Sequence, residues 1–66
     1  MVEIVMTFCR FRRDENFNPI GYPQYAQIRG TSVKNINAEV QTLRDSNEIN
    51  KWTPWTFVRV DSVEVI

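Results

Sequence analysis

Basic and aromatic residues are interleaved at one place in the chain, the run Arg10-Phe11-Arg12-Arg13. Guanidinium groups can bind phosphate while an aromatic ring stacks on a base, so the run is compatible with nucleic-acid binding. Arginine and aromatic residues are also frequent anchors of protein interfaces. A third interpretation is a solvated strand end, in which Asp14-Glu15 neutralises the arginines. The net charge of zero disfavours nucleic acid, because binding to a polyanion depends on excess basic charge.

Residues for catalysis and metal binding are scarce. The chain has no histidine, the side chain used most often for acid–base catalysis. Cys9 is the only cysteine, which excludes an internal disulfide and the usual zinc sites. The neighbouring Arg10 would point to the opposite face of a strand, so we interpret Cys9 as a small buried apolar residue. We therefore predict a non-enzymatic protein with no catalytic residue, metal or cofactor.

The first two predicted elements are strands. Alternating side chains with many β-branched and aromatic residues predict a strand from Val2 to Arg13, and its two fairly apolar faces are typical of a central strand. The stretch Asp14–Pro23 contains two prolines, a glycine and two asparagines, and predicts a long connection. A short second strand is expected over Gln24–Arg29, ending at Gly30.

A helix is predicted next. Thr31 or Ser32 offers an N-cap, and apolar residues then recur at spacings of three and four. The helix should end near Asp45 or Ser46. The apolar stripe consists of Val33, Ile36, Val40 and Leu43.

The last predicted strand covers Thr56–Ile66, after a polar loop over Asn47–Pro54. Its alternation changes phase at Asp61-Ser62. One extra residue moves every later side chain to the other face of a sheet, so a bulge at this point would restore the phase. The alternative is a turn followed by a short fourth strand.

These elements predict a single α+β domain over residues 1–66, with the order strand, strand, helix, strand. A right-handed crossover gives a three-stranded antiparallel sheet of order 2-1-3 with one helix on one face. The predicted core is Ile4, Met6, Phe8, Ala26, Ile28, Ile36, Val40, Leu43, Val58 and Val60. The predicted open face carries Val5, Thr7, Cys9, Phe11, Tyr25, Trp55 and Phe57. An exposed apolar face of that size is typical of an interaction site.

Bulky residues also occur in the predicted connections. Phe17, Ile20 and Tyr22 either fold back as a small cluster or serve as binding anchors. Trp52 and Trp55 flank Pro54, and we expect at least one of them to cap an end of the core, because each brings a large apolar area.

The order of elements resembles small phage-encoded inhibitor proteins of the host-takeover and anti-defence kinds, including the host RNA-polymerase inhibitors of T7-like phages. The resemblance lies in Tyr25-Ala26-Gln27-Ile28, the helix after Thr31-Ser32, and Thr56-Phe57-Val58-Arg59-Val60. It covers about two-thirds of the chain as a pattern of elements. Such inhibitors are often acidic, whereas this chain is neutral. The resemblance implies a stoichiometric binder that blocks a host enzyme.

The first functional hypothesis is a protein-binding module that acts through the open sheet face and the 14–23 loop. The alternatives are a weak nucleic-acid binder using Arg10–Arg13, and a structural subunit whose open face forms a homodimer. The lone cysteine, the acidic residue near the N-terminus and the lack of a long apolar run predict a cytoplasmic protein that does not bind membranes. The candidate partner-binding residues are Arg10, Phe11, Arg12, Arg13, Phe17, Tyr22, Tyr25, Trp55 and Phe57.

Overall fold

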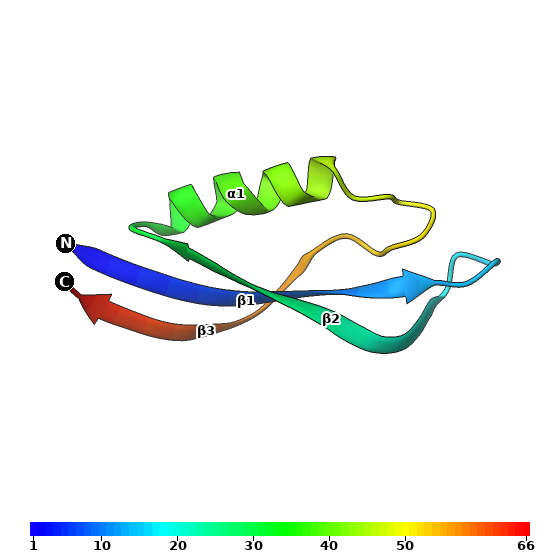
Figure 1. Ribbon diagram of the computed structural model, residues 1–66, viewed down its shortest axis with the longest axis horizontal. Coiled ribbons are helices and arrows are strands. Elements are labelled where there is room, and N and C mark those ends of the chain that lie inside the picture. Colours follow the sequence, from blue (N-terminus) through cyan, green and yellow to red (C-terminus); the bar gives the residue numbers. More distant parts are fainter.

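Three antiparallel strands and one helix make up the computed structural model, which describes all residues 1–66 (Figure 1). The sheet has the order β2-β1-β3, so the predicted α+β fold and strand order are confirmed. The elements are β1 (Val2–Arg13), β2 (Pro19–Gly30), α1 (Val33–Asp45) and β3 (Thr56–Val65).

The turn between β1 and β2 is shorter than the sequence predicted. The Asp14 carboxylate accepts hydrogen bonds from the backbone N–H groups of Asn16 and Asn18 at 2.8 and 2.9 Å, and Phe17 adopts a φ of 64°. An Asx-type turn of this kind closes the hairpin within five residues. The prediction of a connection over Asp14–Pro23 is therefore wrong, because β2 already begins at Pro19.

A wide irregularity in β2 explains that error. Arg12 pairs with Ile20 and Arg10 pairs with Gln24, so the three residues 21–23 lie opposite Phe11 alone. Gly21 adopts a φ of 73° there. Glycine and proline are tolerated at a bulge in an edge strand, where a missing N–H costs no ladder hydrogen bond.

The helix forms where the sequence predicted it, and it covers β1 and β2. The Ser32 hydroxyl accepts the N–H of Asn35 at 3.2 Å and caps α1. Gly30 allows a close approach, because a Cβ at this position would lie 2.8 Å from Cγ1 of Ile36. The buried core consists of Met6, Phe8, Ile36, Val40 and Trp55, flanked by Ile4, Ala26, Ile28 and Leu43.

Two bulges interrupt β3. Val5 pairs with Ser62 and Met6 with Val60, which leaves Asp61 as an extra residue. The predicted bulge at Asp61-Ser62 is therefore confirmed, and the alternative of a turn with a fourth strand is excluded.

The second bulge, at Val58, was not predicted. Thr7 pairs with Arg59 and Phe8 with Phe57, so Val58 is unmatched. Phe57 consequently lies on the helix side of the sheet and not on the open face. The prediction that Val58 and Val60 are core residues is also wrong, because both are exposed.

The molecule is extended for its size. The helix lies nearer to β2 than to β3, which forms the opposite side of the molecule (Figure 1). The Cα radius of gyration is 13.4 Å, whereas a compact domain of this length has roughly 11 Å. The accessible surface of 4786 Å² likewise exceeds the value of about 4,400 Å² typical for this mass. The chain therefore buries less surface than a compact monomer of its size.

The fold predicts a strong dependence on the side chain of Ile36. It is fully buried, so Ile36→Ala should lower the free energy of unfolding by roughly 2–5 kcal/mol, measured by urea denaturation. Val33→Ala is the matched control, because Val33 lies on the same helix with about half of its side chain exposed, and it should change stability by less than about 1 kcal/mol. Equal losses in the two variants would show that α1 does not pack on the sheet in this orientation.

Candidate functional site

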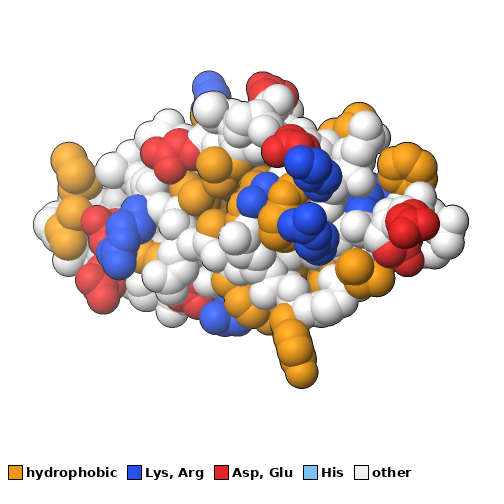
Figure 2. Space-filling view, turned by 45° about the vertical axis from the view of Figure 1, so that its right-hand side comes forward, with side chains coloured by type: hydrophobic (Ala, Val, Ile, Leu, Met, Phe, Trp, Pro, Cys, Tyr) orange, Lys and Arg blue, Asp and Glu red, His pale blue; other side chains and the backbone are white.

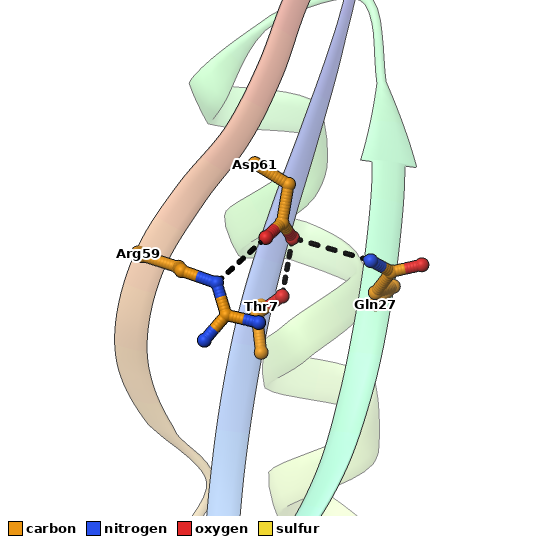
Figure 3. A network of polar contacts seen from close by, with 4 residues as sticks. All are labelled: Thr7, Gln27, Arg59 and Asp61. Carbon is orange, nitrogen blue, oxygen red and sulfur yellow. Dashed lines mark hydrogen bonds and ion pairs between the residues drawn. The ribbon is translucent and has the colours of Figure 1, made fainter.

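The open face of the sheet, on the side away from α1, is held by a polar network. Figure 3 shows the Asp61 carboxylate lying over β1, where it accepts a hydrogen bond from the Thr7 hydroxyl. The same carboxylate accepts from Arg59 Nε at 2.8 Å and from Gln27 Nε2 at 3.4 Å. Thr7 is 1% exposed, although it points to the face that no helix covers. The Asp61 bulge therefore closes the middle of the open face.

This network shifts the titration of Asp61. The hydrogen bond from Thr7 is the main cause of a pKa below the usual value of 3.8, and Arg59 and Gln27 act in the same direction. Partial desolvation of the carboxylate opposes them. At neutral pH Asp61 is thus a stabilised anion, which suits a structural role better than proton transfer.

The prediction of a large apolar open face is wrong. Val5 and Thr7 are buried, Cys9 and Phe11 are half-buried, and Tyr25 is the exposed aromatic residue of this face. Farther along the same face, Arg29 forms an ion pair with Glu3 at 3.2 Å. The remaining two predicted members are elsewhere, since Trp55 belongs to the core and Phe57 lies on the helix side of the sheet.

Arginine and tryptophan side chains gather on the helix side, beyond the C-terminal end of α1. The guanidinium carbon of Arg10 lies 3.9 Å from the ring centroid of Trp52 and 4.6 Å from that of Trp55. Arg12 lies 5.7 Å from the Trp52 ring. Figure 2 shows basic and hydrophobic side chains side by side on this part of the surface. Trp55 is 7% exposed, so the prediction that a tryptophan caps the core is confirmed.

The arginines are held by rings, amides and carbonyl groups. Arg10 also donates to the side chains of Gln24 and Asn47, and Arg13 donates to the carbonyl oxygens of Trp52 and Phe17. None of the three ion pairs in the structure joins this run to Asp14-Glu15, so the predicted neutralisation by these acids is not observed. Because guanidinium groups lie against the tryptophan rings, fewer ring faces are free to stack on a base.

The segment after the helix is fixed to β1 by its main chain. The N–H of Arg13 donates to the carbonyl of Lys51 at 2.7 Å, and the N–H of Thr53 donates to the carbonyl of Phe11 at 2.8 Å. The N–H of Phe11 in turn donates to the Thr53 hydroxyl at 2.8 Å. Residues 51–53 thus lie beside the C-terminal end of β1, on the same side of β1 as β3. They position Trp52 next to Arg10 and Arg12.

The end of the hairpin carries three of the bulky residues singled out from the sequence. Phe17, Ile20 and Tyr22 are all exposed, and Tyr22 is 97% exposed. They do not fold back as a buried cluster. Phe17 lies in the turn, and Tyr22 lies in the bulge of β2.

The sequence prediction missed a strip of exposed apolar side chains on the helix side of β3. The members range from 49% exposed for Val60 to 84% for Val65. They pair with β1 residues that share the face of the core, and Phe57 contacts Phe8 edge to face at a centroid distance of 5.9 Å. α1 leaves them uncovered because it lies over the other two strands. The β3 strip consists of Phe57, Val60, Val63 and Val65.

A signal for the strip was present in the sequence. Phe57, Val60, Val63 and Val65 are spaced by three, three and two residues. A bulge in each of the first two intervals places all four on one face. Only the bulge at Asp61 was predicted, so Phe57 was assigned to the wrong side.

Sites for small molecules or metals are not found. The surface contains no pocket, and no group of His, Cys, Asp or Glu side chains is arranged to hold a metal ion. The single helix is too short and too polar to cross a bilayer. Comparisons of the chain with protein-family models, curated proteins and solved structures find no match.

The Asp61 network predicts a pH dependence of stability. A carboxyl group whose pKa is lowered on folding stabilises the protein above its unfolded pKa, here about 3.8, and this contribution is lost as the pH falls through the folded value. Asp61→Asn should therefore lose less stability than the wild type between pH 5 and pH 2, measured by chemical denaturation at each pH. Glu15→Gln, at an exposed position of the hairpin turn, is the control and should keep the wild-type slope. Identical slopes for Asp61→Asn and the wild type would contradict the network.

Proposed function

We propose that the protein is a non-enzymatic binding module that contacts a protein partner through the β3 strip. The observation that carries this proposal is the exposure of all four strip side chains on the same face as the core. Contiguous exposed apolar side chains on a small protein are typical of an interaction surface. The open sheet face is a weaker candidate, because the network around Asp61 makes its centre polar.

The free energy that a partner would contribute by covering the β3 strip supports the proposal. Burying a large aliphatic or aromatic side chain contributes about 1.5–3 kcal/mol, so covering four side chains with exposed fractions between 49% and 84% contributes on the order of 3–6 kcal/mol. The total stability expected for a chain of 66 residues is of similar size, roughly 3–10 kcal/mol. A partner on the strip would therefore change the free energy of the whole domain substantially.

The extended shape supports the same proposal. A chain with excess surface and a small buried core gains more from a partner than a compact domain does. A stoichiometric inhibitor, the role implied by the resemblance to phage proteins, is one form that such a module takes. The exposed end of the hairpin, with Phe17 and Tyr22, provides a second area that a large partner would contact.

Nucleic acid is the less favoured ligand on structural grounds as well. Arg10 is engaged by two tryptophan rings and two amide side chains, and Arg13 by two carbonyl groups. Arg12 is the exposed member of the run. A single exposed arginine in this run and a net charge of zero provide a weak electrostatic basis for binding a polyanion.

Site-specific photocrosslinking tests the proposal. A photoreactive phenylalanine analogue replaces Val63 in the strip or, as the control, Gln41 on the exposed side of α1, and the protein is irradiated in lysate of cells that produce it naturally. Position 63 should give a discrete protein adduct, which can be another protein or a second copy of this chain, and position 41 should not.

Three results would contradict the proposed function. One is the absence of an adduct at position 63. Another is the same set of adducts at both positions, which would indicate nonspecific contact. The third is an adduct that nuclease treatment removes, since it would identify nucleic acid as the bound molecule.

A further inference from the structure

The outer edge of β3 presents free main-chain groups. The N–H of Ile66 donates to the carbonyl of Met1 at 2.8 Å, and the antiparallel register continues from this pair through Glu3–Glu64 to Val5–Ser62. Hydrogen-bonded and non-hydrogen-bonded pairs alternate in an antiparallel ladder. The N–H and C=O groups of Val63 and Val65 therefore point away from β1, toward solvent.

The two edges of the sheet differ in their surroundings. Pro19, Pro23 and a bulge of three residues hinder pairing along the first part of β2, whereas Gln24–Gly30 contains no proline and keeps one register with β1. The stretch from Ser62 to Val65 is likewise regular and contains no proline. The helix α1 packs closer to β2 than to β3, so an added strand would have α1 beside it at β2 but not at β3.

The charges on the open face indicate what such a strand should carry. Glu64 lies directly opposite Glu3, and like charges in this position destabilise a strand pair. Glu3 is bound by Arg29 at 3.2 Å, whereas Glu64 takes part in none of the ion pairs. Glu64 is exposed and lies on an edge strand, so an added strand would place one of its own side chains next to Glu64, and a cation at that position would relieve the repulsion.

We propose that β3 receives an extended segment of a partner protein as an antiparallel fourth strand, with a Lys or Arg opposite Glu64 and apolar residues opposite Val63 and Val65. This inference rests on the proposed function and names the chemistry of its partner. The two valines exchange main-chain hydrogen bonds with the new strand. Glu64 then sits in a narrow pair, with a Cα–Cα distance of about 4.5 Å, where a basic side chain is close. The apolar residues of the partner, on both sides of its Lys or Arg, lie next to Val63 and Val65 and extend the β3 strip.

A second copy of the chain fits this edge less well. Self-pairing about a two-fold axis at Glu64 places the two Glu64 carboxylates opposite each other in the narrow pair. Moving the axis to Val63 brings the bulge at Asp61 opposite Val65 of the other copy and breaks the pairing. Both registers are unfavourable, so charge and regularity point to a different protein.

A titration of the protein with peptides of opposite charge, monitored by NMR, tests the proposal. Two blocked five-residue peptides are compared, Thr-Val-Lys-Val-Thr and Thr-Val-Glu-Val-Thr. The Lys peptide should shift the amide signals of Val63 and Val65 and bind about 3- to 10-fold more tightly than the Glu peptide, as expected for opposite against like cross-strand charges. The Glu64→Lys variant, with its fold checked by its amide spectrum, should reverse this preference.

Each other outcome contradicts a defined part of the proposal. Equal binding of both peptides would overturn the role of Glu64. Binding with shifts away from β3, or no binding of either peptide to a protein that still crosslinks through position 63, would overturn strand addition while leaving the proposed function intact. A concentration-dependent dimer, shown by light scattering and abolished by Val63→Pro or Val65→Pro, would identify a second copy as the occupant.

Discussion

One helix of 13 residues has to cover a sheet of three strands, and this constraint shapes the rest of the molecule. A helix is about 10 Å wide with its side chains, whereas strands lie about 4.8 Å apart, so one helix shields about two strands. The core accordingly forms over β1 and β2, from Met6 and Phe8 to Ile36 and Val40. Trp55 closes this core at the end beyond the helix. The helix side of β3 is left to solvent.

The two bulges of β3 determine which of its side chains lie on each side of the sheet. The extra residue Val58 moves Phe57 to the helix side, and the extra residue Asp61 moves Val63 and Val65 to the same side. Asp61 itself reaches over Thr7 and fills the centre of the open face with hydrogen bonds. The same two insertions thus make one side of the sheet polar and collect apolar side chains on the other.

Much of the architecture could be predicted because local patterns agree with the tertiary structure. The alternation of Val2–Arg13, the capped helix after Ser32 and the rule for crossover handedness suffice for the strand order. The start of β2 could not be predicted, since Gly21 and Pro23 are turn residues that also occur at bulges. The bulge at Val58 was missed because an alternation that simply continues also fits Thr56–Val60, and only the spacing of Phe57, Val60 and Val63 along the strand indicates it.

The candidate site was harder to predict than the fold. Of the nine candidate residues, only Phe57 belongs to the β3 strip, although it had been placed on the other face. The arginine run was predicted as a candidate binding site, and in the structure Arg10 and Arg12 lie against Trp52 and Trp55, which are about 40 residues away in sequence. Contacts at such separation depend on how the segment 51–53 docks on β1, and a single sequence does not encode that docking in a local pattern.

Strand addition to this protein requires that β3 is hydrogen-bonded along one edge and free along the other. Amide hydrogen exchange of the isolated protein, read residue by residue by NMR, tests it most directly. The amides of Ser62 and Glu64, which face β1, should exchange slowly, and those of Val63 and Val65 should exchange at rates close to those of exposed amides. Equal protection of all four amides would contradict this arrangement of β3, because the outer edge would then already be paired.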